Sequence, residues 1–266
     1  MSTILDYLTH MHETGLSVSY IKLHRSAISA FHEEVNGLSV GKHTMVSQLI
    51  RGASNDRLPR PRHLPVWDIS VVLDFMDTTI TQNLDIRMLS KKLATLLAIT
   101  SLHRGSELHL LNLDLLSLFD DRAEFKFTDQ HKHSKAGVLG KPSVFYRFEN
   151  NTNLCPRECI ISYLEATFSW RNTQAGPLSL SVVKPHKPVT KQSIARWVKD
   201  YLLAAGIKGF TPHSTRGAAS SKAKAKGVST EDILCKGNWS RKSTFERYYH
   251  RQIATPTHRF QSAILS

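Results

Sequence analysis

Two side chains that can carry positive charge lie three residues apart in the stretch TPHSTRG, residues 211–217. Its Thr-Pro pair predicts a helix start, with Thr211 as N-cap and Pro212 at the first helical position. His213 and Arg216 would then share one face of the first turns, where free N–H groups and the helix dipole attract anions. The stretch therefore predicts an anion site, although a solvated basic helix start has the same pattern.

Four further side chains suited to phosphate chemistry occur along the chain. Arg104 lies in HRGSEL and Lys132 in QHKHSKAG, while Trp239 follows a Gly-Asn pair and Tyr248 comes nine residues later. Two guanidinium groups can hold the oxygens of a phosphodiester bidentately, and a tyrosine hydroxyl can attack the phosphorus. Phosphate loops, dinucleotide fingerprints, zinc-protease motifs and serine-hydrolase elbows are absent from the sequence, so those enzyme classes lack their usual signatures.

In order and spacing, these residues resemble the tyrosine recombinase (phage-type integrase) family over roughly residues 85–250. The family pattern is an Arg in Arg-x-x-Glu-Leu, a Lys on a β-hairpin, His-x-x-Arg, then a His or Trp, then a Tyr. Here the positions are filled by Arg104, Lys132, His213, Arg216, Trp239 and Tyr248, with Glu107 in the first motif. The pieces RPRHLPVWD, KHSKAG and LCPRECIISYLEAT look most like recombinases of eukaryotic mobile elements, the DIRS-like and Crypton groups.

The resemblance implies a role for each position. The two arginines would hold the phosphate, and His213 would donate to it or take the tyrosine proton. Lys132 would protonate the departing 5′ oxygen, with Lys135 as the alternative acid. Trp239 has only an indole N–H, so it can donate a hydrogen bond but cannot shuttle a proton. Glu107 is expected to support the local structure without reacting.

Tyr248 is the expected nucleophile, and its neighbour Tyr249 competes for that role. Consecutive helical residues point about 100° apart, so only one of the two can face the phosphate. The family spacing favours Tyr248. Tyr249 lies four residues after Phe245 and is expected to face the core.

The implied function is a site-specific recombinase or integrase that breaks and rejoins double-stranded DNA through a 3′-phosphotyrosyl intermediate, as a homotetramer on DNA. Because the covalent link conserves the bond energy, no metal, ATP or other cofactor is expected. Two alternatives stay open. One is a type IB topoisomerase-like enzyme, and the other is a domesticated, non-catalytic DNA-binding protein.

The charge balance favours a nucleic-acid partner. The 266 residues include 35 Lys and Arg against 22 Asp and Glu, a formal net charge of +13, and most of the excess follows residue 65. This balance suits a polyanion, although a merely soluble basic protein has the same composition. No apolar run approaches the roughly 18 residues of a membrane span, and no signal pattern is present. We expect a soluble intracellular protein, nuclear in a eukaryote, with no membrane partner and no small-molecule substrate.

The cysteines fit a reducing compartment. Cys155, Cys159 and Cys235 are odd in number and scattered, which disfavours a disulfide framework. Because no second close Cys or His pair follows the first two, the sequence does not predict a zinc site.

Basic residues outside the six positions are candidate DNA contacts, and simple solvation is the alternative for each. They are Arg57, Arg60, Arg62, Lys222, Lys224, Lys226, Arg241 and Lys242.

Apolar spacing predicts a mainly α-helical protein with one small β-sheet. A helical, core-binding-like DNA-binding domain, residues 1–56, is short for the resembled family. A basic Pro-rich linker, residues 57–65, leads to the catalytic domain, residues 66–266. The expected helices are 3–14, 17–34, 43–52, one capped by Asp68, 86–101, 157–170, 191–205, 212–226, 230–236 and 243–252, and the expected strands are 115–119, 123–128 and 143–148.

Overall fold

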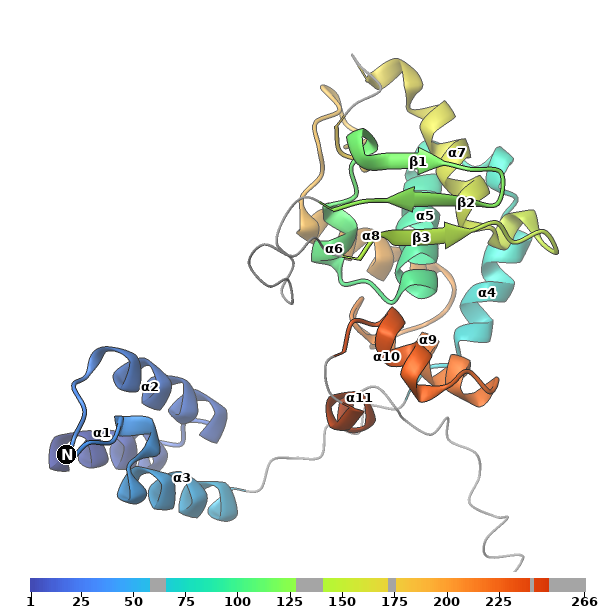
Figure 1. The fold of residues 1–266 in the computed structure, drawn as a ribbon. Coiled ribbons are helices and arrows are strands. Elements are labelled where there is room, and N and C mark those ends of the chain that lie inside the picture. The colour runs from blue at the N-terminus through green and yellow to red at the C-terminus, as the bar shows by residue number, and fades with distance from the viewer. Residues whose placement is uncertain (58–65, 128–140, 172–175, 240–241, 249–266) are drawn as a thin grey trace, which may run out of the picture. The chain divides into compact units, whose positions relative to one another are not determined.

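The computed structural model describes residues 1–57, 66–127, 141–171, 176–239 and 242–248. Backbone contacts divide the chain into two compact units, Met1–Leu64 and Pro65–Ser266. Each unit buries its own hydrophobic cluster, and Figure 1 labels the helices and strands of both. Of the predicted linker, only Arg57 lies among the described residues.

The described residues of the N-terminal unit form three α-helices: α1 (Ser2–Glu13), α2 (Val18–Phe31) and α3 (Thr44–Asp56). α2 ends before the predicted residue 34 because His32 takes an extended backbone conformation, with φ −89° and ψ 142°. Apolar side chains at helical spacing fill the core of this unit. They are Ile4, Leu8, Met11, Ile21, Val40, Val46 and Ile50.

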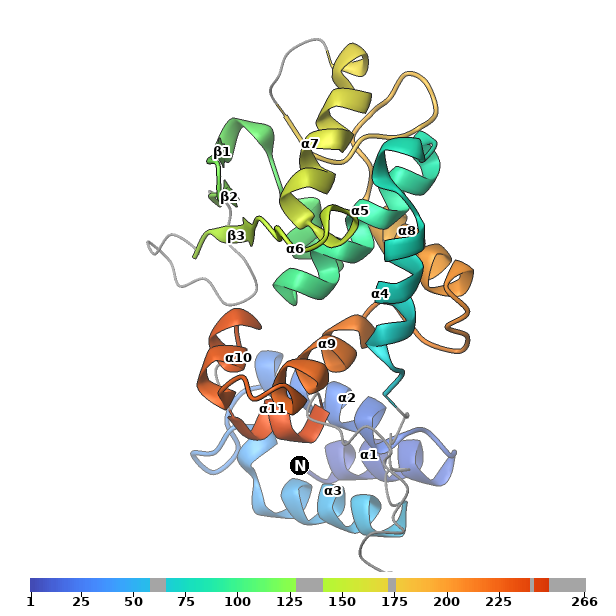
Figure 2. The same ribbon diagram turned by 90° about the vertical axis from the view of Figure 1, so that its right-hand side faces the viewer.

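The second unit is built around α5 (Ile86–Ser101), which is buried along most of its length. α5 packs against α7 (Pro156–Ala166) and α8 (Lys191–Ala204), and Figure 2 shows their arrangement. A helix that is apolar on nearly all sides belongs in the interior. α5 therefore forms the base on which the site is assembled.

Aspartate side chains cap two helices of this unit. The Asp85 carboxylate accepts hydrogen bonds from Arg87 N and Met88 N at the start of α5. The predicted cap Asp68 accepts from Ser70 N at the start of α4 (Ile69–Thr78). These three bonds satisfy N–H groups that have no partner within the helix.

The sheet consists of β1 (Leu116–Leu118), β2 (Arg122–Phe125) and β3 (Ser143–Tyr146), antiparallel in that order. The described pairing of β2 with β3 ends where Phe125 lies opposite Ser143. β3 contacts α5 and α7, and Figure 1 shows the sheet across α5. Each strand is shorter than predicted.

The C-terminal helices are α9 (Ser214–Ala225), α10 (Thr230–Lys236) and α11 (Lys242–Tyr248). α10 has the predicted bounds, because the Ser229 side chain caps it by accepting from Asp232 N. The protein is thus mainly α-helical with a small three-stranded sheet, as predicted. No helix in the described part of the chain is long and apolar enough to cross a membrane.

The predicted start of α9 is wrong by two residues. Thr211 is not the cap, and Pro212 lies in a turn before the helix. Ser214 donates from both N and Oγ to Thr211 O, and Thr215 Oγ1 donates to Pro212 O. These local bonds compete with a regular helix start. The helix therefore begins at Ser214, with His213 at the N-cap position.

Candidate active site

Arg104 lies in the turn between α5 and α6 (Gly105–His109). α5 ends because Leu102 takes the left-handed conformation, with φ 58°. Arg104 N donates to Glu107 Oε2 at 2.6 Å, and Arg104 Nη1 donates to Glu107 Oε1 at 2.9 Å. One carboxylate therefore fixes both the start of α6 and the direction of the guanidinium group.

Arg216 reaches the same carboxylate from the first turn of α9. It is 1% exposed, and its Nη1 lies 3.7 Å from Glu107 Oε2. Arg216 Nη2 donates to Gly237 O at 2.6 Å, and the guanidinium lies over the Trp239 ring at 4.6 Å. The structure thus brings together four of the predicted positions: Arg104, Glu107, Arg216 and Trp239.

Glu107 remains anionic within this cluster. Burial alone would raise its pKa, but the hydrogen bond from Arg104 N and the charges of His103, Arg104 and Arg216 outweigh that effect. The pKa of Glu107 is therefore held below its ordinary value. Since two guanidinium groups face one carboxylate, the cluster keeps a net positive charge. That charge is suited to binding a phosphate.

Trp239 follows α10 and connects the cluster to α11. Its ring packs directly on Gly237 and lies 5.3 Å from the Phe245 ring of α11, at 46°. Asn238 between them takes a left-handed conformation, with φ 53°, which Asn adopts more readily than most residues. Trp239 is therefore both a core residue and a neighbour of Arg216.

Gly237→Ala is expected to destabilise the protein by about 1–3 kcal/mol, the usual range for overpacking. A methyl group there would lie 2.0 Å from an atom of the Trp239 ring, so the ring must leave Arg216 and Phe245. Urea unfolding and the near-ultraviolet circular dichroism of tryptophan measure both effects. Gly217→Ala is the control, because its added methyl group meets nothing within 4 Å. Equal stability of the two variants would contradict the prediction.

His213 lies at the junction between the turn and α9, three residues before Arg216. Its side chain is exposed, and its carbonyl accepts a hydrogen bond from Arg216 N at 3.3 Å. The backbone therefore places an accessible imidazole at the same helix terminus as the buried guanidinium. This position suits proton exchange with a bound substrate.

The remaining catalytic candidates are only partly described. Tyr248 is the last residue of α11, but its side chain lies outside the described part. Lys132, Lys135 and Tyr249 lie outside the described residues altogether. Their roles stay predictions.

Comparison with known protein families decides the relationship of the chain. The model of the phage integrase family matches residues 68–254. The chain belongs to the phage integrase family. The matched range includes every predicted catalytic position.

Solved structures share the fold of this family member at low identity. XerH site-specific recombinase, bound to a palindromic difH substrate in a post-cleavage complex, is 14% identical with a TM-score of 0.62, covering 99% of this chain and 71% of that one. A lambda integrase dimer bound to a COC′ core site is 14% identical with a TM-score of 0.53, covering 95% and 80%. The Tn1549 transposon integrase in complex with circular intermediate DNA is 17% identical with a TM-score of 0.51, covering 100% and 84%. No curated protein matches in sequence.

The candidate DNA contacts of this phage integrase family member include several side chains with structural partners. Arg57 donates to Leu16 O and His12 O within the N-terminal unit. The other partners found are Ser70 Oγ for Lys222, Thr230 Oγ1 for Lys224 and a Glu246 carboxylate 3.7 Å from Lys242 Nζ. Lys226 is exposed, whereas Arg60, Arg62 and Arg241 lie outside the described residues.

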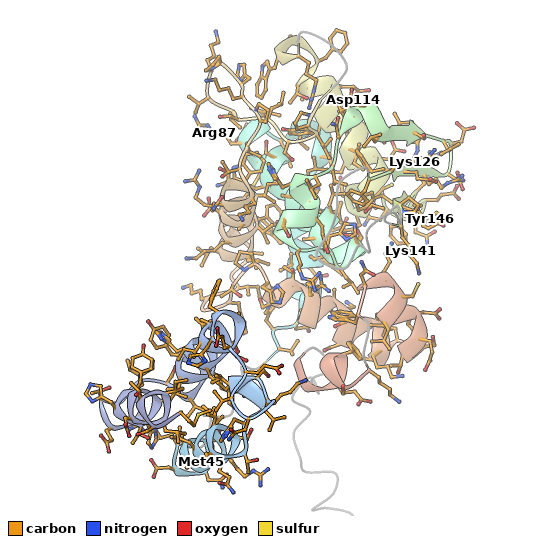
Figure 3. The ribbon with its side chains drawn as sticks, turned by 60° about the vertical axis from the view of Figure 1, so that its left-hand side comes forward. Met45, Arg87, Asp114, Lys126, Lys141 and Tyr146 are labelled. Atoms are coloured by element: carbon orange, nitrogen blue, oxygen red, sulfur yellow. The ribbon has the colours of Figure 1, made fainter. Side chains whose placement is uncertain are left out.

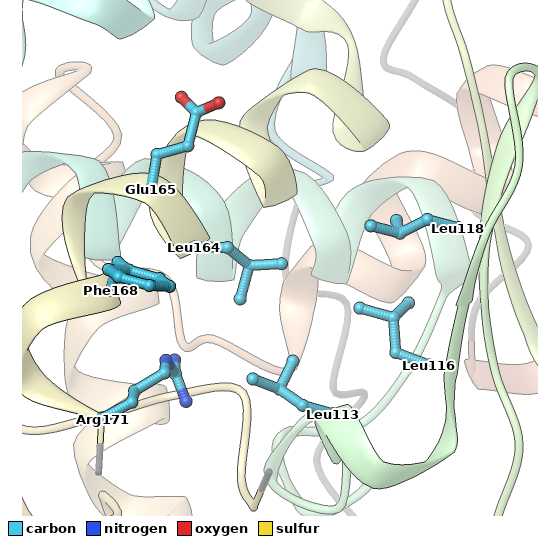
Figure 4. Close-up of a pocket in the computed structure, with 7 residues that line it drawn as sticks. All are labelled: Leu113, Leu116, Leu118, Leu164, Glu165, Phe168 and Arg171. Atoms are coloured by element: carbon cyan, nitrogen blue, oxygen red, sulfur yellow. The ribbon is translucent and has the colours of Figure 1, made fainter. Parts of the chain in front are cut away.

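A separate pocket of about 600 Å³ lies beside β1 and the C-terminal end of α7 (Figure 4). Its described lining includes none of the predicted catalytic residues. The lining residues are Leu113, Leu116, Leu118, Leu164, Glu165, Phe168 and Arg171. The described residues also contain no group of three His, Cys, Asp or Glu side chains placed to hold a metal.

His103 is the site residue that sequence reasoning missed. It directly precedes Arg104, and its Nδ1 lies 3.7 Å from Glu107 Oε2. Its Nε2 is hydrogen-bonded to Ser143 Oγ, 40 positions away in the sequence. The only signal in the sequence was a histidine next to the predicted arginine. The contact with β3 joins residues far apart in the chain, so no local sequence pattern reports it.

Proposed function

We propose that this phage integrase family member is a site-specific DNA recombinase that breaks and rejoins double-stranded DNA through a covalent 3′-phosphotyrosyl intermediate. The observation that carries the proposal is the Arg104–Glu107–Arg216 cluster, with its net positive charge. A preorganised cationic site of this kind stabilises the charge that develops on a phosphate during transfer. Glu107 is held by Arg104, so it acts as support.

The proposed reaction begins when Tyr248 Oη attacks the phosphorus. A bond from Oη to phosphorus forms, the bond from phosphorus to the 5′ oxygen breaks, and the 3′ phosphate stays on the enzyme. His213 takes the tyrosine proton, and Lys132, or Lys135 as the alternative acid, gives a proton to the 5′ oxygen. Attack by the 5′ hydroxyl of another strand reverses these steps. Because each step exchanges one phosphate ester for another, ATP and metal are not required.

The similar solved structures support DNA as the substrate. XerH is bound to a difH substrate and lambda integrase to a core site, while the Tn1549 integrase is in complex with circular intermediate DNA. The proposal extends to a homotetramer on DNA and to an origin in a eukaryotic mobile element of the DIRS-like or Crypton type. Such an element would place the protein in the nucleus.

Covalent trapping on nicked DNA tests the proposal. The substrates are duplexes of random sequence, each with a nick just downstream of the cleavable phosphate. After cleavage, the short fragment that carries the new 5′ hydroxyl dissociates, so religation fails and the enzyme stays linked to the DNA. The reaction contains EDTA and no nucleotide, and adducts are separated under denaturing conditions. We expect an adduct that maps to Tyr248 and an enriched DNA sequence. A strict requirement for added Mg²⁺ would instead indicate another nuclease mechanism.

The trapped sequence then separates the alternatives. Exchange of strands between two duplexes carrying it supports a recombinase. Relaxation of a supercoiled plasmid without exchange would indicate a topoisomerase-like enzyme. Binding without any adduct would indicate a non-catalytic DNA-binding protein.

DNA affinity is expected to fall steeply with salt, because each phosphate contact releases condensed counterions. For six to ten contacts the loss is about 10³–10⁵ in affinity between 50 and 200 mM salt. A plot of log Kd against log salt concentration measures the slope. Lys226→Gln, at an exposed position, should reduce the slope by about one. A flat plot for the wild type would contradict the argument from charge.

A further inference from the structure

We propose that His103 is a positioning residue that holds both ends of the β2–β3 connection against the arginine cluster. Through these contacts it sets the place of the lysine acid, Lys132 or Lys135, which that connection carries. The inference rests on the proposed function, since it assigns His103 a part in protonating the leaving 5′ oxygen.

The described contacts of His103 reach several elements of the fold. Its backbone N donates to Ser101 Oγ at 3.1 Å, which fixes the residue at the end of α5. Nδ1 faces the Glu107 carboxylate, and Nε2 is hydrogen-bonded to Ser143 Oγ. The ring meets the Phe127 ring edge to face, with centroids 6.1 Å apart and planes at 73°. His103 therefore joins α5, α6, β3 and the residues that follow β2.

Phe127 and Ser143, which His103 contacts, flank the connection on its two sides. The described β2–β3 ladder stops at the Phe125–Ser143 pair, so Phe127 lies beyond the ladder on one strand and Ser143 at its end on the other. Both are almost fully buried, which makes their contacts with His103 part of the core. Lys126 and Lys141, labelled in Figure 3, lie next to these anchor points and are exposed.

The imidazole ring has the chemistry that this position needs. Its two nitrogens can serve a carboxylate and a hydroxyl at once, while its face or edge packs on an aromatic ring. At His103, Nδ1 would donate toward Glu107, and Nε2 shares a hydrogen bond with the Ser143 hydroxyl. A residue that cannot reach Ser143 loses the side of this bridge that holds β3. A small shift of a catalytic group through such a loss can cost about 10²-fold in rate.

Changing the leaving group of the DNA substrate shows whether His103 positions the lysine acid or only supports the structure. The probe is the trapped DNA sequence with sulfur in place of the bridging 5′ oxygen. A thiol has a pKa near 8.5, far below that of an alcohol, so the thiolate departs without a proton. When Tyr248 attacks, the phosphorus–sulfur bond breaks, the same phosphotyrosyl link forms, and no lysine proton is used.

His103→Asn retains an amide near the position of Nδ1 and loses the reach to Ser143. We expect single-turnover adduct formation on the oxygen substrate to fall about tenfold to a hundredfold, and to return to within about threefold of wild type on the sulfur substrate. His103→Gln reaches the Nε2 position and should restore most of the oxygen rate. Ser143→Ala should reproduce the defect. His109→Gln, a half-buried histidine on α6, is the matched control and should change neither rate.

Each other outcome overturns the inference. Equal losses on both substrates would mean that His103 acts on the arginine cluster or on folding, and unchanged rates would mean that it has no role. Thermal unfolding of each variant shows whether lost folding causes the equal losses. If the wild type forms no adduct on either substrate, the proposed function itself is wrong and the inference falls with it.

Discussion

Tyr248→Phe is expected to bind DNA as tightly as the wild type and to form no covalent protein–DNA adduct. The substitution removes one hydroxyl group, which is the proposed nucleophile, and leaves the cationic residues in place. α11, which ends at Tyr248, is joined to the cluster by the contact between Phe245 and Trp239. Denaturing electrophoresis of trapped complexes measures the adduct, and fluorescence anisotropy measures the affinity.

Tyr249→Phe is the matched control for this experiment. Because consecutive helical positions are about 100° apart, we expect only one of these two neighbouring tyrosines to face the phosphate. Adduct formation should survive in Tyr249→Phe. An adduct that persists in Tyr248→Phe, or that maps to Tyr249, would show that the nucleophile is misassigned.

Arg216→Lys is expected to lower the rate of adduct formation by about 10²–10³, the usual cost of losing a donor to transition-state charge. Arg216 directs Nη2 to Gly237 O, Nη1 toward Glu107 and its plane over Trp239. A lysine keeps the charge but is a single point donor, so it cannot make these contacts and also hold a phosphate bidentately. Single-turnover kinetics on the trapped sequence measures the loss.

The same substitution should lower the free energy of unfolding by about 1–3 kcal/mol, because hydrogen bonds to a buried charged group are lost. Arg87→Lys is the control. Arg87 is exposed on α5 (Figure 3), so a lysine there should change neither stability nor rate. If the Arg216→Lys variant is less stable but fully active, Arg216 has a structural role only and no part in catalysis.

Local sequence predicts much of this fold. The apolar pattern predicted the bounds of α5, residues 86–101, which the structure confirms. Asp68 and the bounds of α10 are likewise confirmed. These features depend on residues within one or two turns of each other, which is the range that capping and periodicity can report.

The assembled site could be predicted only in part. Spacing selected Arg104, Glu107, Arg216 and Trp239, which the structure brings together, but it did not show that Arg216 is buried or bonded to Gly237 O. The start of α9 was misplaced because the hydroxyls of Ser214 and Thr215 favour a turn that a Thr-Pro pair does not reveal. His103 was missed because its partner Ser143 is remote in sequence, and such pairs depend on tertiary packing.

The helix α5 is enclosed on most of its sides by the rest of its unit, so its length is as constrained as its composition. An inserted residue turns a helix by about 100° and advances it by about 1.5 Å. Insertion within α5 would therefore rotate the residues of α5 that follow the insertion, and Arg104 just beyond them, relative to the α7 and α8 surfaces that pack on this helix. The exposed β1–β2 turn at residues 119–121 can absorb the same insertion by lengthening. In a scan of single-residue insertions, we therefore expect insertions at residues 86–101 to prevent folding. Substitutions in the same helix by apolar residues of similar size should be tolerated.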